Sequence, residues 1–348
     1  MLHLYQQANV AHRHRRPNYP ASRMITLPNT PQARVQIDDT LSVAVNSFLP
    51  DDEHHIFNSP KFFALHSQGR SYYFQLYNVR KNQVLATIHF TETAKDYFRS
   101  PARGTFGGIS TLGSLPIEII ESFLACIERI LTEGSPCGIE IVIAPASHDQ
   151  SLFSQVFNVL LRRGYSILAN DLNQDIGIDT ETLAEKMEYG NVKRLRKCVR
   201  EGFHCAVLGR DAYSVAYDVI AANRKRRGVP ISMTLEGVME MVNCFPDHLK
   251  FFGVHRDDSI VASAICIKVR LDVLYVFYWG EIDGLQSYSP VVMLASFLYE
   301  FCRDAKLRLL DLGTSTLHGV PNRGLMRFKR SLGGRESLKI TFTKAAAA

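Results

Sequence analysis

The sequence of 348 residues lacks the patterns that mark several large classes of protein. No apolar run approaches the ~18 residues that a membrane-spanning helix needs. The seven cysteines are scattered, odd in number and without a Cys-x-x-Cys pair, which excludes a disulfide framework and a zinc site of ordinary spacing. Walker A, Rossmann glycine and Gly-x-Ser-x-Gly patterns are missing as well. We therefore expect a cytoplasmic chain with buried free thiols, no metal and no covalent enzyme intermediate.

Positive charge is in small excess and is concentrated at the start of the chain. Of the net charge of +6, four charges come from Arg13, Arg15, Arg16 and Arg23, in a segment without acidic residues. We expect residues 1–35 to form a disordered basic extension, with Met24 as an alternative start. A targeting peptide or a nucleic-acid-binding arm is the other interpretation. The alanine tail after residue 344 is set aside as a cloning remnant.

The first half of the folded part alternates strand and helix patterns. Apolar residues at helical spacing and Pro116 as first residue predict one amphipathic helix. The expected elements are strands at 72–77 and 84–91, a helix at 116–133, a strand at 139–144, a helix at 152–163 and a strand from residue 165.

The second half repeats this order at nearly constant spacing. The expected elements are strands at 249–254, 260–269 and 274–279, a helix at 289–303, a strand at 307–312, a helix at 322–331 and a strand at 337–343. Ser289 is the expected N-cap, Pro290 opens the helix, and the apolar residues that follow on all its sides predict burial. We expect a mixed α/β fold made of two similar domains, residues 36–185 and 186–344.

Two basic runs lie in the second half, at 193–200 and 224–227. One interpretation is a pair of solvated helix faces, the second of them favoured by the dipole at a helix C-terminus. The alternative is a wall that binds phosphates or an acidic substrate.

Three segments resemble one known family. Gly-Leu-Met-Arg-Phe-Lys-Arg-Ser-Leu-Gly-Gly at 324–334 resembles a signature near the end of Fem-type (FemAB-like) aminoacyl and acyltransferases. The basic helix that ends at Gly202 is similar to the start of that family's second domain, and Phe106-Gly107-Gly108 resembles a segment of its first. The resemblance covers residues 55–343. It implies two tandem GNAT-like domains, with a sheet that splays open at the strand over 275–281 and exposes backbone to a pantetheine-like chain.

The sequence departs from the patterns of this family in two places, and both bear on the identity of the acyl donor. The segment 280–286 does not match the Gln/Arg-x-x-Gly-x-Gly/Ala pattern that commonly accompanies acetyl-CoA, and no long charged helical hairpin typical of tRNA-dependent relatives is present. We expect acyl-CoA as the donor, with aminoacyl-tRNA as the alternative.

Amide formation needs a held acceptor, a base and a donor to the oxyanion. Lys329 is the expected cation near the transferring group, Glu281 the expected base or amine-holding carboxylate, and Tyr278 the third catalytic candidate. The expected cofactor-binding residues, along the strand end and the helix start, are Trp279, Ser287, Ser289 and Val291. The expected substrate-binding residues are Asn223, Arg224, Glu236, Asp311, Thr314, Ser315, Asn322 and Phe328.

The resulting hypothesis is an N-acyltransferase that moves an acyl group from acetyl-CoA or another acyl-CoA to a small-molecule or peptide amine by direct attack. An aminoacyl-tRNA-dependent transferase acting on cell-wall precursors is the first alternative. A non-catalytic binding protein that keeps the fold is the second. The sequence does not indicate an oligomeric state.

Overall fold

The computed structural model describes residues 32–50 and 55–346. Most of the basic extension expected at residues 1–35 lies outside them. Strand β1 (Ala33–Gln36) pairs with β2 (Leu41–Val45), so the folded chain begins before Gln36, where the sequence pattern had placed its start. In the described part no helix has the length and apolar character needed to cross a membrane.

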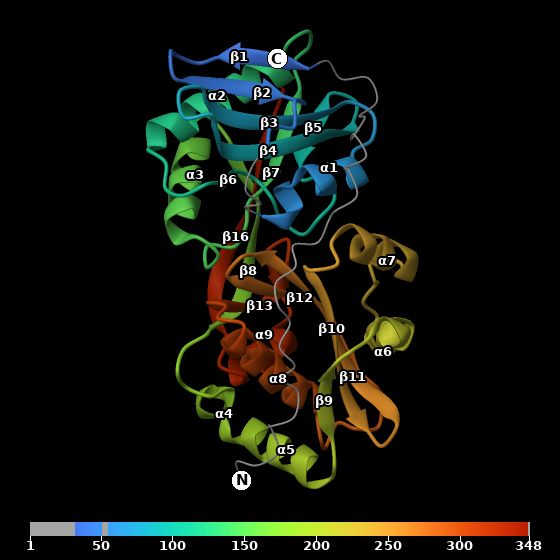
Figure 1. Cartoon of the computed structure of the whole chain (residues 1–348). Coiled ribbons are helices and arrows are strands. Elements are labelled where there is room, and N and C mark those ends of the chain that lie inside the picture. The colour runs from blue at the N-terminus through green and yellow to red at the C-terminus, as the bar shows by residue number, and fades with distance from the viewer. Residues whose placement is uncertain (1–31, 51–54, 347–348) are drawn as a thin grey trace.

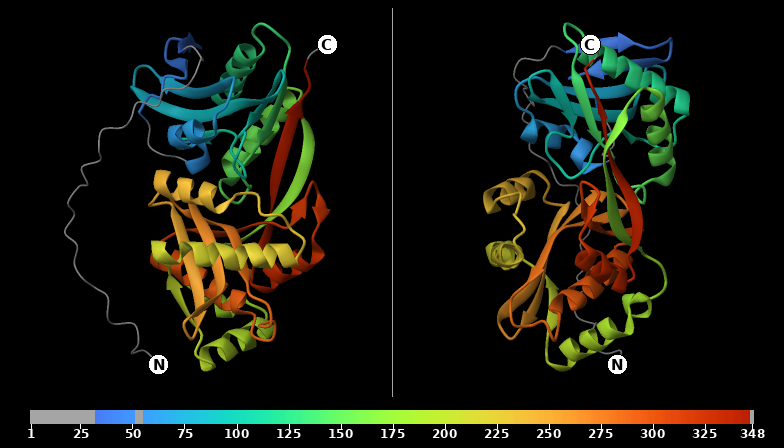
Figure 2. Two further views of the ribbon diagram at one scale, coloured as in Figure 1. Left: turned by 90° about the vertical axis from the view of Figure 1, so that its right-hand side faces the viewer. Right: turned by 180° about the vertical axis from the view of Figure 1, so that it is seen from behind.

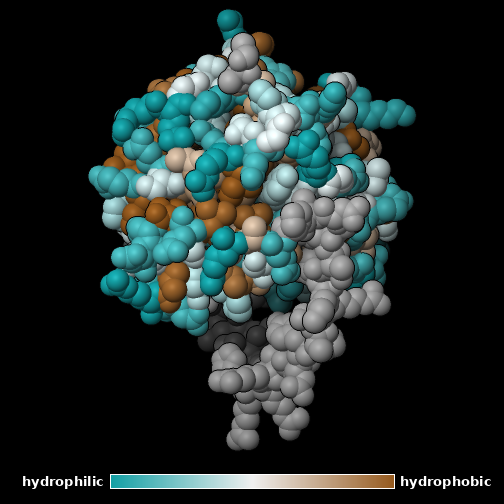
Figure 3. All heavy atoms as spheres, turned by 90° about the horizontal axis from the view of Figure 1, so that it is seen from above, coloured by the Kyte–Doolittle hydropathy of each residue, from teal (hydrophilic) through white to brown (hydrophobic). Residues whose placement is uncertain are grey.

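The first half builds one end of a continuous mixed sheet (Figure 1). Its further strands are β3 (Ser71–Asn78), β4 (Gln83–Ala94), β5 (Tyr97–Ser100), β6 (Ser110–Thr111) and β7 (Gly138–Val142). Its helices are the 3-10 turn η1 (Ile56–Asn58), α1 (Pro60–His66), α2 (Ile117–Leu131) and α3 (Gln150–Arg162). As its spacing predicted, α2 buries one apolar face, which includes Phe123 and Ile127, in the core of this half. Seen from this end of the molecule, hydrophobic residues gather near the middle of the face and hydrophilic ones surround them (Figure 3).

The second half repeats the arrangement. Its strands are β9 (His204–Val207), β10 (Leu249–Arg256), β11 (Ser259–Arg270), β12 (Val273–Glu281) and β13 (Leu309–Thr314), with a separate hairpin of β14 (Thr316–Leu317) and β15 (Val320–Pro321). Its helices are α4 (Leu183–Lys186), α5 (Tyr189–Arg200), η2 (Arg210–Ala212), α6 (Tyr213–Arg226), α7 (Leu235–Cys244), α8 (Pro290–Asp304) and α9 (Arg323–Ser331). The predicted mixed fold and the repeated element order are confirmed.

Helices cover both faces of the second half's sheet. Successive residues of a strand point to opposite faces. Phe251 accordingly stacks on Tyr213 of α6, while Phe252 contacts Phe301 of α8. No residue from 290 to 303 is exposed, because α8 lies between the sheet and α5. The predicted burial of this helix is confirmed.

The two halves exchange their last strands. Strand β8 (Ser166–Gly177) follows α3, yet its end pairs with β13 of the second half. Strand β16 (Arg335–Lys344) follows α9, yet Thr341–Lys344 pair with β7 of the first half. The two exchanged strands also pair with each other and run side by side from one half to the other (Figure 2). The division into residues 36–185 and 186–344 stays a prediction, and the exchange means that each segment completes the sheet of the other.

Candidate functional site

The strands β12 and β13 separate partway along their length. They pair in parallel only from Val273–Tyr275 to Leu309–Asp311. Beyond that point β12 continues to Glu281, whereas β13 turns towards β8 and pairs Thr314 with Asn173. The edge of β12 that faces β13 therefore has no strand partner after Tyr275 in the described part of the chain. The resemblance implied a splayed sheet at this strand, and the structure confirms it.

Lys329 holds the diverging end of β13. Its side chain is 2% exposed, and its Nζ donates to the carbonyl oxygens of Gly313 at 2.8 Å and Thr314 at 2.9 Å. Burial lowers the pKa of Lys329 to about 7, which the charge of Asp311 opposes. Gly313 has a φ of +80°, a left-handed conformation that favours glycine. The expected catalytic lysine is thus tied to backbone beside the opening.

The two glycines that end the 324–334 motif have a packing role. The N–H of Gly334 donates to the carbonyl oxygen of Lys329, and a Cβ at position 334 would lie 2.7 Å from that oxygen. Gly333 has a φ of +92°, and a Cβ at this position would lie 2.9 Å from Cβ of Lys186. The motif therefore fixes the end of α9, and through it Lys329.

Asp311 lies where the strands part and is fully buried. It accepts hydrogen bonds from Asn173 Nδ2 and the N–H of Gly313, both at 2.7 Å. Its other oxygen lies 2.8 Å from Nε2 of His148, which the loop after β7 brings from the first half. Asp311 was expected to contact substrate; in the structure its oxygens bind protein groups, and one of these comes from the other half.

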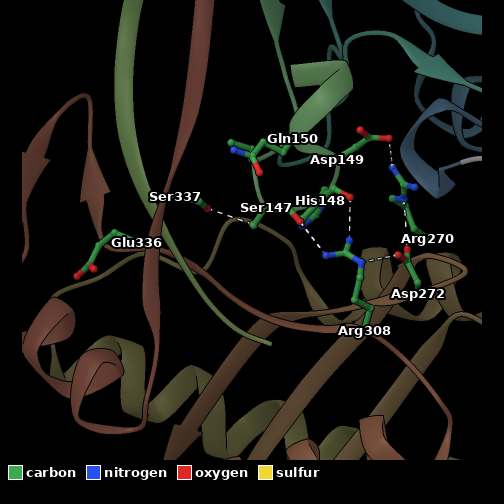
Figure 4. A pocket seen from close by; sticks show the side chains of 10 residues that line it. Ser147, His148, Asp149, Gln150, Arg270, Asp272, Arg308, Glu336 and Ser337 are labelled. Atoms are coloured by element: carbon green, nitrogen blue, oxygen red, sulfur yellow. Dashed lines mark hydrogen bonds and ion pairs between the residues drawn. The ribbon is translucent and has the colours of Figure 1, made fainter. Parts of the chain in front are cut away.

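Further polar groups surround this pair at the junction of the halves. Burial raises the pKa of Asp175, to which Ser337 Oγ donates, and Ser315 Oγ donates to Gln174. Arg308 donates to the carbonyl oxygens of Ser147 and His148 and fixes the loop that carries the histidine (Figure 4). A cavity of about 600 Å³ opens here, lined by residues of both halves that include Arg270, Asp272 and Glu336.

Glu281 caps helix α8. Its Oε2 accepts from the N–H of Val291 at 3.2 Å, whereas Ser289, the expected cap, has a φ of +51° and no capping side-chain bond. Ser289 thus occupies the predicted N-cap position before Pro290, but its hydroxyl makes no capping bond, and the buried carboxylate of Glu281 supplies one instead. The N–H of Val292 donates to the carbonyl oxygen of Ser289. The N–H groups of Val291 and Val292 therefore both have partners within the protein and do not point outwards from the first turn of α8.

The two basic runs meet around this cap. Burial raises the pKa of Glu281, while the N–H of Val291 and the charges of Arg227, Arg226 and Arg194 oppose the rise. Asn223 Nδ2 and Arg226 donate to the carbonyl oxygen of Glu281. A cationic surface from α5 and the end of α6 therefore frames the wide end of the opening.

Tyr278 and Trp279 point to opposite faces of the sheet. Tyr278 is buried on the α6 side, where its hydroxyl bonds to Ser232 and the guanidinium of Arg224 lies 5.1 Å from its ring. Trp279 packs on Phe328 of α9, with ring centroids 5.8 Å apart. These expected residues form two groups on either side of the opening.

The remaining expected residues lie on the surface or support the backbone. Asn322 caps α9 by accepting from the N–H of Leu325. Glu236 is exposed in the first turn of α7, whose cap is Thr234. Ser287 is exposed and lies 3.5 Å from Nζ of Lys197. Thr314 contributes its carbonyl oxygen to Lys329.

His148, Asn173 and Asp175 were not predicted from the sequence. His148 stands in the polar segment Ser147-His148-Asp149 directly after a predicted strand. Asp311 was singled out because it follows a buried strand, and His148 has the same kind of position. Loops after strands often carry functional groups. Nothing in the sequence pairs the two positions.

No family model matches this chain, and no curated protein matches it significantly. Solved structures do. FemX shares 11% identity over 91% of this chain and 97% of its own, with a TM-score of 0.64. L-PGS from Bacillus licheniformis shares 13% identity over 76% and 82%, with a TM-score of 0.52. A tandem GNAT protein from the clavulanic acid biosynthesis pathway matches with 10% identity over 80% and 84% and a TM-score of 0.46. The chain thus has the fold of FemX, and the resemblance of its motifs to Fem-type tandem GNAT proteins is confirmed at the level of the fold.

Proposed function

We propose that this chain is a transferase that forms an amide by direct attack of an amine on an activated acyl group. The observation that carries the proposal is the opening between β12 and β13, which leaves the edge of β12 from Val276 to Glu281 free to pair with an amide-containing chain. A donor bound there would have its reactive end near Tyr275 and Asp311, where the strands part. The structural likeness to FemX and L-PGS supports a transferase of this general type.

The first candidate donor is an acyl-CoA. Its pantetheine arm has the alternating amides that a free strand edge can bind. The cationic groups at the wide end, Arg194, Arg226 and Arg227, supply charge for its phosphates. The acceptor in this proposal is an amine on a small molecule or a peptide.

A specific observation favours aminoacyl-tRNA as the second candidate. Glu281 already accepts from Val291, so the start of α8 presents a carboxylate where a pyrophosphate would otherwise bind. Helix α5 exposes Lys193, Arg194, Arg196 and Arg200, a surface suited to a nucleic-acid backbone.

A binding experiment separates these candidates. Trp279 is the only tryptophan of the sequence and lies beside the opening, so its fluorescence should report a donor that enters there. We expect acetyl-CoA to change this emission and to give a binding isotherm in calorimetry. No binding at millimolar acetyl-CoA, together with binding of aminoacyl-tRNA, would replace the first candidate by the second.

Transfer itself is tested by mass spectrometry of a primary-amine panel incubated with each donor. The matched pair of variants is Trp279→Phe, beside the opening, and Phe297→Leu, on the far side of α8 against Phe252. Trp279→Phe removes the only tryptophan and so identifies the source of the signal, whereas Phe297→Leu should keep the donor-dependent change in emission. If neither donor binds and no acceptor is modified, the chain is the non-catalytic binding protein.

A further inference from the structure

A second, smaller cavity lies beside the large one at the junction of the halves. It measures about 40 Å³ and is lined by His55, Asn58 and His148 of the first half, among others, and by Arg270 of the second. The two cavities share His148, Asp149 and Arg270. The small cavity therefore adjoins an open one that is wide enough to admit a substrate.

Three residues that line the small cavity each carry a buried polar atom without a hydrogen-bond partner in the described part of the chain. These atoms are Nε2 of His55, Oδ1 of Asn58 and Nδ1 of His148. Leaving such an atom unpaired costs about 1–3 kcal/mol, so three around one cavity require an explanation.

Each of these residues has a second polar atom with a known partner. That partner shows whether the unpaired atom is a hydrogen-bond donor or an acceptor. His55 Nδ1 accepts from the N–H of Phe57 at 3.2 Å, so the proton of this imidazole is on Nε2. Burial lowers the pKa of His55 well below its usual value, which keeps the ring neutral. Asn58 Nδ2 donates to the carbonyl oxygen of Gly108, so Oδ1 is an acceptor.

The same reasoning applies to His148. Its Nε2 faces the carboxylate of Asp311 at 2.8 Å and donates to it, which leaves Nδ1 with a free lone pair. The three unpaired atoms are therefore one donor, on His55, and two acceptors, on Asn58 and His148.

One donor and two acceptors are what the formation of an amide needs. We propose that this cavity is the reaction centre for the acceptor amine, with His148 as its base and Asp311 as the residue that positions the base. The inference rests on the proposed function and extends it, because it places the acceptor at the narrow end of the opening, where Asp311 lies.

In the proposed step the amine donates its N–H groups to Nδ1 of His148 and Oδ1 of Asn58. The amine nitrogen bonds to the acyl carbon, and Nε2–H of His55 donates to the oxyanion. His148 takes the amine proton. The bond from carbon to the thioester sulfur, or to the ester oxygen, then breaks, and the leaving group receives that proton from His148. No other reactant is needed.

The charged groups around His148 suit this role. Asp311 from β13 and Asp175 from β8 stabilise the imidazolium that forms, since the charge of His148 also acts on Asp175. Arg270 of the second half lines the same cavity and places a like charge on the other side of the ring. Arg308 binds the backbone of His148 and fixes the direction of the ring.

The first test measures the site without any donor. Formamide is the smallest amide, with a carbonyl for His55 and N–H groups for the two acceptors. In ¹⁵N spectra of histidine-labelled protein we expect formamide to shift Nδ1 of His148 and Nε2 of His55, both assigned with Gln variants. His204 and His255, a stacked pair on β9 and β10, are internal controls and should not shift. If the resonances of His148 and His55 do not respond, or if Nδ1 of His148 carries a proton in the free protein, the inference is overturned.

The second test is kinetic. His148→Gln retains an N–H for Asp311 but has no basic nitrogen, so the fold is kept. We expect its kcat/KM to fall about 100-fold or more, with partial rescue of His148→Ala by imidazole. His255→Gln should leave the rate unchanged. Transfer by His148→Gln at the wild-type rate would overturn the inference, whereas a wild-type protein that binds formamide here but transfers nothing would refute the proposed function and leave an amide-binding site.

Discussion

The two halves share an order of elements but differ where their parallel strands part. In the first half β5 pairs with β7 up to Ser100 and Ile141, and the chain then returns to the same edge. Gly107 forms a bridge with Ile143, and its N–H donates to the carbonyl oxygen of Val142 at 2.8 Å. In the second half nothing in the described chain returns to β12 after Tyr275.

The two halves therefore share a fold, but among the residues that the structure describes only the second has an opening beside its parallel strands. The loop that closes the first half needs Gly107, since a Cβ there would lie 2.8 Å from Cδ of Pro101. The second half instead keeps its strands apart with Gly313 and the buried amine of Lys329. We expect the second half to receive the donor and the first half to supply groups to the junction.

The largest expected effect comes from Lys329, which holds the diverging end of β13 in the second half. Burial lowers the pKa of Lys329 from 10.5 to about 7. Between these values the unfolded chain holds the proton and the folded one does not, so the free energy of unfolding rises with pH, by up to about 5 kcal/mol. Lys329→Met should remove this rise and abolish transfer, whereas Lys193→Met on the exposed face of α5 should do neither. Urea denaturation at pH 6.5 to 10 measures the effect, and parallel pH curves for wild type and Lys329→Met would contradict it.

The exchanged strands predict that the halves unfold together. Phe342 comes from the end of the chain but is fully buried in the core of the first half, 5.5 Å from Phe157. Phe342→Ala should cost about 4 kcal/mol, and Leu338→Ala, on an exposed position of the same strand, much less. Trp279 fluorescence reports the second half and circular dichroism the whole chain. If Phe342→Ala separates the two transitions and leaves that of Trp279 unchanged, the halves are independent.

Features that depend on residues close together in the sequence could be predicted, and contacts between distant segments could not. The burial of α8 depends on neighbouring apolar residues, so it could be predicted. Lys329 stands in a compact motif that singles it out, and its catalytic role stays a prediction. The pair of His148 and Asp311 joins positions 163 residues apart, and the exchange of β8 and β16 places strands beside a partner from the other half. Neither leaves a pattern within a segment. The N-cap position of Ser289 was predicted from its local signature, whereas the capping bond of Glu281 was not, because this carboxylate reaches α8 from the end of β12.

A smaller effect should distinguish the histidines of the two halves. His89 is buried in the first half, where its Nε2 lies 2.7 Å from the carbonyl oxygen of Phe57, and burial lowers its pKa to about 4. As the pH falls from 6.5 to 4 the unfolded chain takes up the proton first, so stability is lost, by about 3 kcal/mol. His89→Gln keeps the donor and should flatten this loss in acid denaturation. His255→Gln, at a more exposed site of the second half, should change it less, and equal effects would contradict the contrast.

The smallest expected effect on stability concerns α2 of the first half and its counterpart α8 of the second half. Helix α2 starts after Pro116 without a capping side chain, whereas α8 is capped by Glu281. Burial raises the pKa of Glu281, so the stability linked to its protonated form is present below pH 4.5 and is lost as the pH rises through the folded pKa. Glu281→Gln keeps an acceptor for Val291 and should change the free energy of unfolding by about 1 kcal/mol or less.

Its effect on the donor is more informative than its effect on stability. If phosphates bind the start of α8 in place of the carboxylate, Glu281→Ala should bind acetyl-CoA more tightly than the wild type in calorimetry, because the competing anion is gone and Arg226 and Arg227 remain. If Glu281 is instead the base that the sequence suggested, Glu281→Gln should lose transfer without a change in donor affinity. A variant with unchanged affinity and unchanged rate would leave Glu281 as a cap alone, and the contrast between the two halves would then rest on the strands and Lys329.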